Sequence, residues 1–235
     1  MRKAETGETI QAAVRSACFT AGIDFDKLDP GAVPLFEIIT AHPLRVAELP
    51  ETNLRLRFST AADFISRELG QSVSAPSGED YPLSGFLYAH EFAGNYYGVI
   101  LTEKSDLTTR RRYSAAHELG HYLLHFLPLL ESQFEREDPD ALIWTEGLSF
   151  NAGNETNEAT LIGKPSPALK SEAEIEREAN LFAAELLMPE HACRSFAVSY
   201  QSQFKVNKIA MRRRMACEFF VSFEAMSRRL DDLGL

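Results

Sequence analysis

Two histidines stand four residues apart in the segment His117-Glu118-Leu119-Gly120-His121, with a glutamate directly after the first. Residues four apart share one face of an α-helix, where their β-carbons are about 5–6 Å apart. Two imidazoles in that position can bind one Zn²⁺, and the glutamate can act as a general base towards water. The segment therefore predicts a helix that carries a metal site, and it indicates a metal-dependent peptidase with Glu118 as the base.

The helix that carries this motif is predicted to span about residues 107–126, with Asp106 as its N-cap. Its apolar side chains form one face, made of Ala115, Ala116, Leu119, Leu123 and Phe126. At about 100° per residue, His117 and His121 lie far from the centre of that face. Histidines in this position are expected to line a cleft, because core histidines would lie on the apolar side.

A catalytic zinc ion usually has three protein ligands, so the histidine pair needs a partner. Residues 171–187 are predicted to form a helix, because Ser171 followed by Glu174 is the pattern of a capping box. Among the glutamates of this helix, Glu176 lies nearest to the apolar stripe, at roughly 60° from its centre, whereas Glu178 lies at about 100°. We predict Glu176 as the third ligand, with Glu178 as the second candidate.

Three further residues are candidates for supporting roles at this site. Asn180 follows Glu176 by one helical turn and is expected to hydrogen-bond a group that holds the metal. Tyr113 and His90 are candidates for stabilising the oxyanion that forms during peptide hydrolysis. His125 continues the histidine series, but each step of four residues drifts by about 40° around an α-helix, so a structural role is expected for it.

The composition excludes several classes of protein. The chain of 235 residues has a formal net charge of −10, which disfavours broad attraction to nucleic acids or membranes. It shows no secretion signal and no apolar run long enough to span a bilayer, so a cytoplasmic protein without membrane contact is expected. Cys18, Cys193 and Cys217 lack CxxC spacing, as expected for buried thiols in a reducing compartment. A cysteine that holds the metal as an inhibitory ligand is the alternative.

The pattern along the chain predicts an α+β fold, namely a mostly helical domain with a small antiparallel sheet and C-terminal helix-turn-helix-like helices. Aromatic and β-branched runs around Ala93-Gly94-Asn95 predict a β-hairpin over residues 83–101, and an exposed strand of it could bind a substrate as an added strand. The predicted units are an N-terminal helical segment (1–55), the core (56–190) and a C-terminal helical subdomain (191–235). Within the core, residues 128–170 lack periodicity and are expected to be a surface insertion or mobile loop.

Two motifs resemble those of the ImmA/IrrE family of metallopeptidases. The first is segment 113–125, which follows Arg110-Arg111-Arg112. The second is segment 176–189, because that family's second motif begins with Glu and continues with Ala and then Asn or Asp, three and four residues on. Residues 220–235 are similar to the family's C-terminal helices. The resemblance extends from about residue 60 to the end of the chain.

The resemblance implies a gluzincin-like core in which His117, His121 and Glu176 bind Zn²⁺, or alternatively Mn²⁺, and Glu118 is the base. It also implies cytoplasmic cleavage of a helix-turn-helix repressor, in a pathway that responds to DNA damage or controls mobile elements or phage defence. The 54 residues from 122 to 175 are more than a compact member of the family would have between its motifs, and the surplus is the segment 128–170.

Two alternative functions stay open from the sequence. The chain could be a module that binds a transcription regulator without cleaving it. DNA could instead be an activating ligand that gates the peptidase, bound by a basic stretch within residues 205–214 (Lys205, Lys208, Arg212, Arg213 and Arg214). The competing interpretation of this stretch is a set of solvated cations on helices that cap the core.

Overall fold

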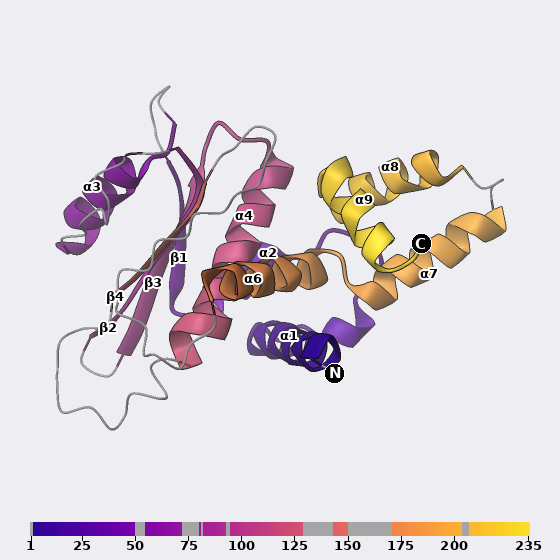
Figure 1. The fold of residues 1–235 in the computed structure, drawn as a ribbon, viewed down its shortest axis with the longest axis horizontal. Coiled ribbons are helices and arrows are strands. Elements are labelled where there is room, and N and C mark those ends of the chain that lie inside the picture. The colour runs from indigo at the N-terminus through magenta and orange to yellow at the C-terminus, as the bar shows by residue number, and fades with distance from the viewer. Residues whose placement is uncertain are drawn as a thin grey trace.

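The computed structural model describes residues 2–49, 55–71, 80, 82–92, 95–128, 143–149, 171–203 and 207–235. The α-helices are α1 (Arg2–Thr20), α2 (Leu35–Thr40), α3 (Phe58–Leu69), α4 (Thr108–His121), α6 (Glu172–Leu187), α7 (Glu190–Gln203), α8 (Lys208–Phe219) and α9 (Phe223–Asp232). Two short helical turns are η1 (Phe25–Lys27) and η2 (Tyr122–Phe126), and the strands are β1 (Leu44–Leu49), β2 (Leu83–Phe92), β3 (Asn95–Glu103) and β4 (Ile143–Ser149). These elements confirm the predicted α+β class (Figure 1).

The predicted hairpin is confirmed by β2 and β3, which pair antiparallel from Gly85 with Thr102 to Phe92 with Asn95. The sheet as a whole is mixed rather than antiparallel, because β1 runs parallel to β3. Strand β1 lies within residues 1–55, for which only helices were predicted. Its sequence, LRVAEL, lacks the strict alternation of apolar and polar residues that indicates a half-buried strand.

Part of the segment 128–170 is a strand rather than a surface loop. Residues 143–149 form β4, which pairs antiparallel with β2 and completes the strand order β1-β3-β2-β4. Both strands of the hairpin therefore have a neighbour on each side, and the prediction that one of them is exposed at an edge is wrong. The rest of the segment, 129–142 and 150–170, lies outside the described residues.

The two faces of the sheet pack against different helices. Leu87, Ala89 and Ile100 share a buried cluster with residues of α4 and α6, while Phe86, Tyr88, Val99 and Leu101 share one with residues of α3. Figure 1 shows α3 on one side of the sheet and α4 with α6 on the other. As a result, α4 is enclosed between the sheet and α6, and this position determines the surroundings of its histidines.

The C-terminal helices α7, α8 and α9 lie on the side of α6 away from the sheet (Figure 1). Arg229 of α9 forms an ion pair with Glu185 of α6 and donates a hydrogen bond to the Met188 carbonyl oxygen at 3.0 Å. Residues 220–222 connect α8 to α9, so these helices form the predicted helix-turn-helix-like pair. Among the described helices, none has both the length and the apolar character needed to cross a membrane.

Candidate metal centre

Helix α4 is buried on more sides than its apolar pattern indicates. Residues 114–121 are all buried, and the exposed fractions of His117 and His121 are 1% and 0%. The sequence-based interpretation assumed a single packing surface, but the sheet and α6 pack on different sides of α4. The histidines are therefore buried between these two layers.

The start of α4 also differs from the prediction. Leu107 is the N-cap residue, and its side chain forms no cap hydrogen bond. The carboxylate of Asp106 instead forms ion pairs with Arg55, at 2.9 Å, and with Arg110, at 3.1 Å. The prediction that Asp106 is the N-cap is wrong, because these cations compete for the oxygens that would accept from the first turn of the helix.

Helix α6 begins as predicted, with a capping box formed by Ser171 and Glu174. It approaches α4 closely at Gly120. A β-carbon built on Gly120 would stand 3.2 Å from both the Ala179 Cα and the Phe182 Cβ. Such contacts are tighter than the usual separation of about 3.5–4.0 Å between carbon atoms, so glycine is what permits this approach. The approach places the first turns of α6 beside the histidines of α4.

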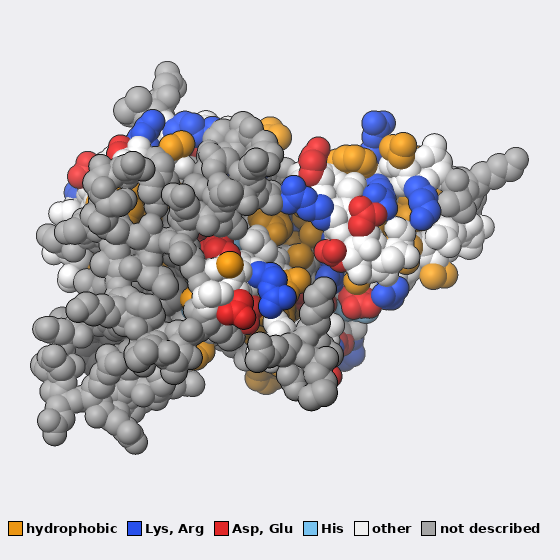
Figure 2. Space-filling view, viewed as in Figure 1, with side chains coloured by type: hydrophobic (Ala, Val, Ile, Leu, Met, Phe, Trp, Pro, Cys, Tyr) orange, Lys and Arg blue, Asp and Glu red, His pale blue; other side chains and the backbone are white. Residues whose placement is uncertain are grey.

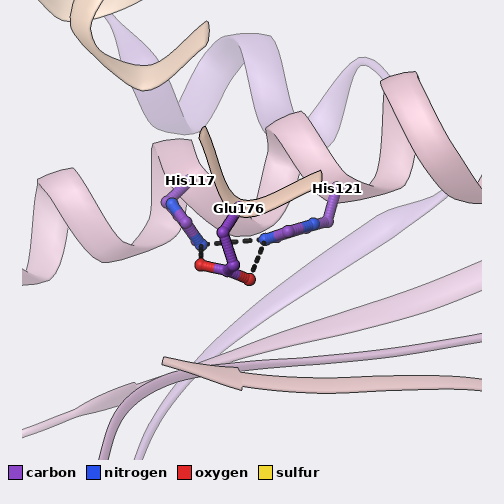
Figure 3. A group of neighbouring side chains, drawn as sticks. All are labelled: His117, His121 and Glu176. Carbon is purple, nitrogen blue, oxygen red and sulfur yellow. Dashed lines mark hydrogen bonds and ion pairs between the residues drawn. The ribbon is translucent and has the colours of Figure 1, made fainter. Parts of the chain in front are cut away.

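His117, His121 and Glu176 converge at this helix contact. The Nε2 atoms of the two histidines are 2.8 Å apart, and the Glu176 carboxylate lies 3.4 Å from His117 Nε2 and 3.2 Å from His121 Nε2. Figure 3 shows the three side chains pointing toward one another on the side of α4 that faces the strands. The predicted partner of the histidine pair is thus beside it, and Glu178 is not part of this group.

The donor set fits a single divalent cation. One donor atom from each residue lies within 4.8 Å of the others, and all three residues are buried. The separations of 2.8–3.4 Å are shorter than twice a zinc–nitrogen or zinc–oxygen bond of about 2.0–2.2 Å, so one ion can contact all three. Two imidazoles and one carboxylate are also a ligand set that zinc accepts in catalytic sites.

The electrostatics of His117 favour the form that binds metals. Burial lowers the pKa of His117 from its ordinary value, and the neighbouring His121 lowers it further, while Glu176 and Asn180 act in the opposite direction. The neutral imidazole is the form that coordinates a metal. Asn180 is thus next to His117, and it also accepts a hydrogen bond from the Tyr113 hydroxyl at 3.2 Å. Asn180 therefore lies beside one of the three candidate ligands, and Tyr113 is linked to that ligand through Asn180.

Glu118 is fully buried, with an exposed fraction of 0%, and its carboxylate is held against strand β2. A β-carbon on Gly85 would stand 2.6 Å from Glu118 Oε1 and 3.2 Å from the Ser114 Cβ. The absence of a side chain at Gly85 leaves the space in which the carboxylate lies. The predicted base is therefore positioned by contact between α4 and the sheet.

His90 lies elsewhere. It follows Phe86 and Tyr88 on the face of β2 that packs towards α3, and its ring contacts those of Tyr88 and Tyr97. Gly85, Leu87 and Ala89 occupy the opposite face, which packs against α4. The structure does not bring His90 to the metal group, and the alternation of side chains across a strand is the physical reason.

The cysteines also lie apart from this group. Cys18 and Cys193 are buried in the core around α1, α6 and α7, whereas Cys217 is exposed. Burial is thus confirmed for two of the three, and the prediction is wrong for Cys217. No cysteine joins a metal-binding group in the part of the chain that the structure describes.

Sequence reasoning missed the placement of His125 and Glu178. His125 Nδ1 lies 3.1 Å from His121 Nδ1, and His125 Nε2 lies 3.2 Å from Glu178 Oε2. The expected angular offset of His125 assumed a regular α-helix, but Tyr122–Phe126 is a π-helical turn. The sequence feature that could have indicated this contact is the recurrence of histidine at the same four-residue spacing, at His117, His121 and His125.

A buried His-His-Glu group with a glutamate directly after its first histidine has the composition of a metal-dependent peptidase centre. The family model for Peptidase M78, described as the IrrE N-terminal-like domain, matches residues 67–142 and 165–231, more than half of the chain. The chain belongs to this peptidase family, as its two motifs predicted. Comparison with curated proteins gave no match. Strand β4 lies between the two matched ranges.

Proposed function

We propose that this protein is an endopeptidase that depends on a divalent cation, Zn²⁺ or Mn²⁺, held by His117, His121 and Glu176. The observation that carries the proposal is the convergence of these three donors in a buried site of a chain from a peptidase family. When bound, such a cation polarises the scissile carbonyl and lowers the pKa of water to about 7.

The residues of the chain supply the remaining steps. Glu118 takes the proton from the attacking water as the new C–O bond forms, and the peptide C–N bond breaks when Glu118 delivers that proton to the leaving amine. Its contact with Gly85 holds the carboxylate in one place. Asn180, next to His117 and hydrogen-bonded to Tyr113, holds the first ligand in orientation.

The substrate backbone is proposed to pair with the sheet as an added strand. Both hairpin strands have neighbours, so β4 is the edge strand on the side of β2, the strand whose Gly85 contacts Glu118. An extended peptide along β4 would gain affinity from backbone hydrogen bonds with little selectivity for side chains. Selectivity would then depend on which proteins present an extended segment at this edge.

We also propose that the substrate is a helix-turn-helix repressor, and that its cleavage acts in a DNA-damage, mobile-element or phage-defence pathway. The family model supports a peptidase role in general, and the repressor as substrate is what the resemblance of the two motifs to the ImmA/IrrE family implies. A module that binds a regulator without cleaving it is the alternative, and it predicts a stable complex in which the mass of the partner is unchanged.

The test is incubation of the full chain with the helix-turn-helix protein encoded next to its gene, read by intact mass with and without a chelator. Cleavage is expected only without chelator. Glu118→Gln should keep metal and partner binding and lose cleavage, because the amide cannot accept the proton. Glu224→Gln makes the same change on exposed α9 and should cleave as the wild type does. Cleavage by Glu118→Gln would remove Glu118 as the base.

The basic stretch within 205–214 does not lead us to propose DNA as a ligand. Arg212 forms an ion pair with Asp231, Arg214 forms one with Glu218, and Arg213 lies over the ring of Phe223 at 6.0 Å. Figure 2 shows acidic and basic side chains intermixed over the C-terminal helices. Phosphate contacts would have to compete with these ion pairs.

A further inference from the structure

We propose that Glu178 and His125 form a hydrogen-bonded pair that holds His121 in the tautomer able to bind a metal. This inference rests on the proposed function, because it concerns one ligand of the proposed metal site. It assigns roles to two buried residues that lie outside the group formed by His117, His121 and Glu176. Both act through His121, so they are positioning residues.

Two contacts in a row lead from the carboxylate of Glu178 to the His121 ring, whose other nitrogen faces the metal group. Glu178 Oε2 lies 3.2 Å from His125 Nε2, and His125 Nδ1 lies 3.1 Å from His121 Nδ1. The opposite nitrogen of His121, Nε2, faces the Glu176 carboxylate at 3.2 Å. The exposed fractions of Glu178, His125 and His121 are 6%, 6% and 0%, so bulk water does not compete for these contacts.

The Glu178 carboxylate selects one order of donors along this row, and it opposes the Glu176 carboxylate, which lies beside His121 Nε2 and favours a hydrogen there in the metal-free chain. A neutral imidazole has one N–H and one nitrogen that accepts, whereas a carboxylate only accepts. His125 Nε2 must therefore donate to Glu178, which leaves His125 Nδ1 as an acceptor. His121 Nδ1 then donates to His125, and the lone pair of His121 remains on Nε2. The reverse order would place a hydrogen on His121 Nε2, where the metal would bind.

The π-helical turn explains why His125 reaches His121. In an α-helix with 3.6 residues per turn, a step of four residues overshoots one turn by about 40°. Here the Leu127 amide donates to the Tyr122 carbonyl, which is the five-residue spacing of a π-helix. The wider turn takes up more residues, so His125 comes to lie over His121. Insertions of this kind are frequent at functional sites.

The expected consequence is tighter metal binding. A group that accepts from the second nitrogen of a metal-binding histidine fixes its tautomer and ring orientation and raises its basicity. Loss of such a group commonly lowers metal affinity by about 10–100-fold. We expect that loss when the acceptor for His121 Nδ1 is removed, and a smaller loss when only the carboxylate that orients His125 is neutralised.

The first measurement is the tautomer itself, in the metal-free full chain that carries Glu176→Ala, which removes the competing carboxylate beside His121 Nε2. Long-range ¹H–¹⁵N correlation spectra with ¹⁵N-labelled histidine report which ring nitrogen carries the hydrogen. We expect the hydrogen on Nδ1 of His121 and on Nε2 of His125. A Glu176→Ala chain with the hydrogen on His121 Nε2 would overturn the proposal, whether or not the protein is a peptidase.

The second measurement is Zn²⁺ affinity, determined by competition with a chromophoric chelator. His125→Phe should weaken binding by about 10–100-fold, and Glu178→Gln by about 10-fold. His125→Gln should recover much of the affinity, because its amide oxygen can accept from His121 Nδ1. Glu224→Gln is the exposed control. The melting temperature of each metal-free variant separates loss of fold from loss of affinity.

The outcomes distinguish this proposal from the function on which it rests. If the wild type binds Zn²⁺ and His117→Ala does not, whereas His125→Phe and Glu178→Gln bind as tightly as the wild type, then the positioning role is wrong and the metal site stands. If the wild type binds no Zn²⁺ or Mn²⁺, the metal-dependent function itself fails.

Discussion

Gly85 on β2 lies so close to Glu118 on α4 that a single β-carbon at residue 85 would stand 2.6 Å from the Glu118 Oε1 atom. The rest of β2, all of β3 and most of α4 separate the two residues along the chain, and the fold brings them close together. A buried carboxylate that must accept a proton at one place needs a fixed position. The contact supplies that position through the backbone of the sheet.

Gly85→Ala should therefore reduce peptide cleavage by about 10²-fold or more, within the range attributed to general acid–base catalysis. The added methyl group would displace the Glu118 carboxylate, while the metal ligands would stay in place. Turnover of the repressor substrate and Zn²⁺ affinity are the two measurements. Gly98→Ala adds the same methyl group to β3, where it would stand 2.5 Å from the Leu44 Cδ2 atom and 3.2 Å from the Tyr88 carbonyl oxygen rather than beside Glu118. Equal turnover by Gly85→Ala and the wild type would show that the contact is dispensable.

Features fixed by local interactions were predictable from the sequence. The capping box at Ser171 and Glu174 and the shared face of His117 and His121 both depend on residues within one or two helical turns. Glu176 was found in the same way, from its angle on α6. These signals located the candidate site without knowledge of the tertiary structure.

Features fixed by long-range packing were not predictable. Strand β1 exists because it pairs with β3, about 50 residues further along the chain, and its own sequence gives little sign of it. The burial of the histidines depends on two layers that enclose α4. His125 stays outside the metal group, as expected, but the π-helical turn at Tyr122–Phe126 places it against His121, a contact that regular α-helical winding does not predict.

Gly120→Ala should destabilise the protein even though alanine is the better helix former. In an isolated helix, this change would stabilise by about 1 kcal/mol. Here the methyl group would press on the Ala179 Cα and the Phe182 side chain, and overpacking of this kind costs about 1–3 kcal/mol. Urea unfolding of the metal-free chain measures the sign of the change in the free energy of unfolding.

The matched control for Gly120→Ala is Gly7→Ala in α1, where a β-carbon would meet no described atom within 4 Å. Alanine at this exposed site should show the ordinary helix preference and raise the free energy of unfolding by up to about 1 kcal/mol. The same sign of change at both residues would contradict the close packing of α4 and α6. Zn²⁺ affinity should also fall in Gly120→Ala, because Glu176 would move away from the histidines.

Metal removal should lower the melting temperature. A ligand that binds only the folded chain stabilises it by RT ln(1 + [L]/Kd), which is about 2.7 kcal/mol at one hundred times Kd. Added Zn²⁺ should raise the melting temperature of the chelator-treated wild type and of Glu224→Gln. It should have little effect on His121→Ala, which lacks a ligand. A rise of equal size in His121→Ala would place the bound metal elsewhere.

The three cysteines should differ in reactivity. Burial raises the pKa of the Cys18 thiol to about 11 and that of Cys193 to about 12, while Cys217 is exposed. Only the thiolate reacts with disulfide reagents, so the two buried thiols should be inert at pH 8. A thiol titration should count one group in the native chain, three in denaturant and none in native Cys217→Ser. Two or more reactive groups in the native wild type would contradict this arrangement.

The ion pair between Arg229 and Glu185 should contribute strongly to the attachment of α9. Both side chains are more than nine-tenths buried, and Arg229 also donates to the Met188 carbonyl at the end of α6. Arg229→Ala leaves the Glu185 carboxylate without its cation, and breaking a buried pair in this way costs about 3–5 kcal/mol. Arg194→Ala breaks the exposed pair with Glu190, with side chains 48% and 38% exposed, and should cost about 1 kcal/mol or less. Urea unfolding of the two variants checks the difference. Equal losses would show that the buried pair does not anchor α9 to the helix that carries Glu176.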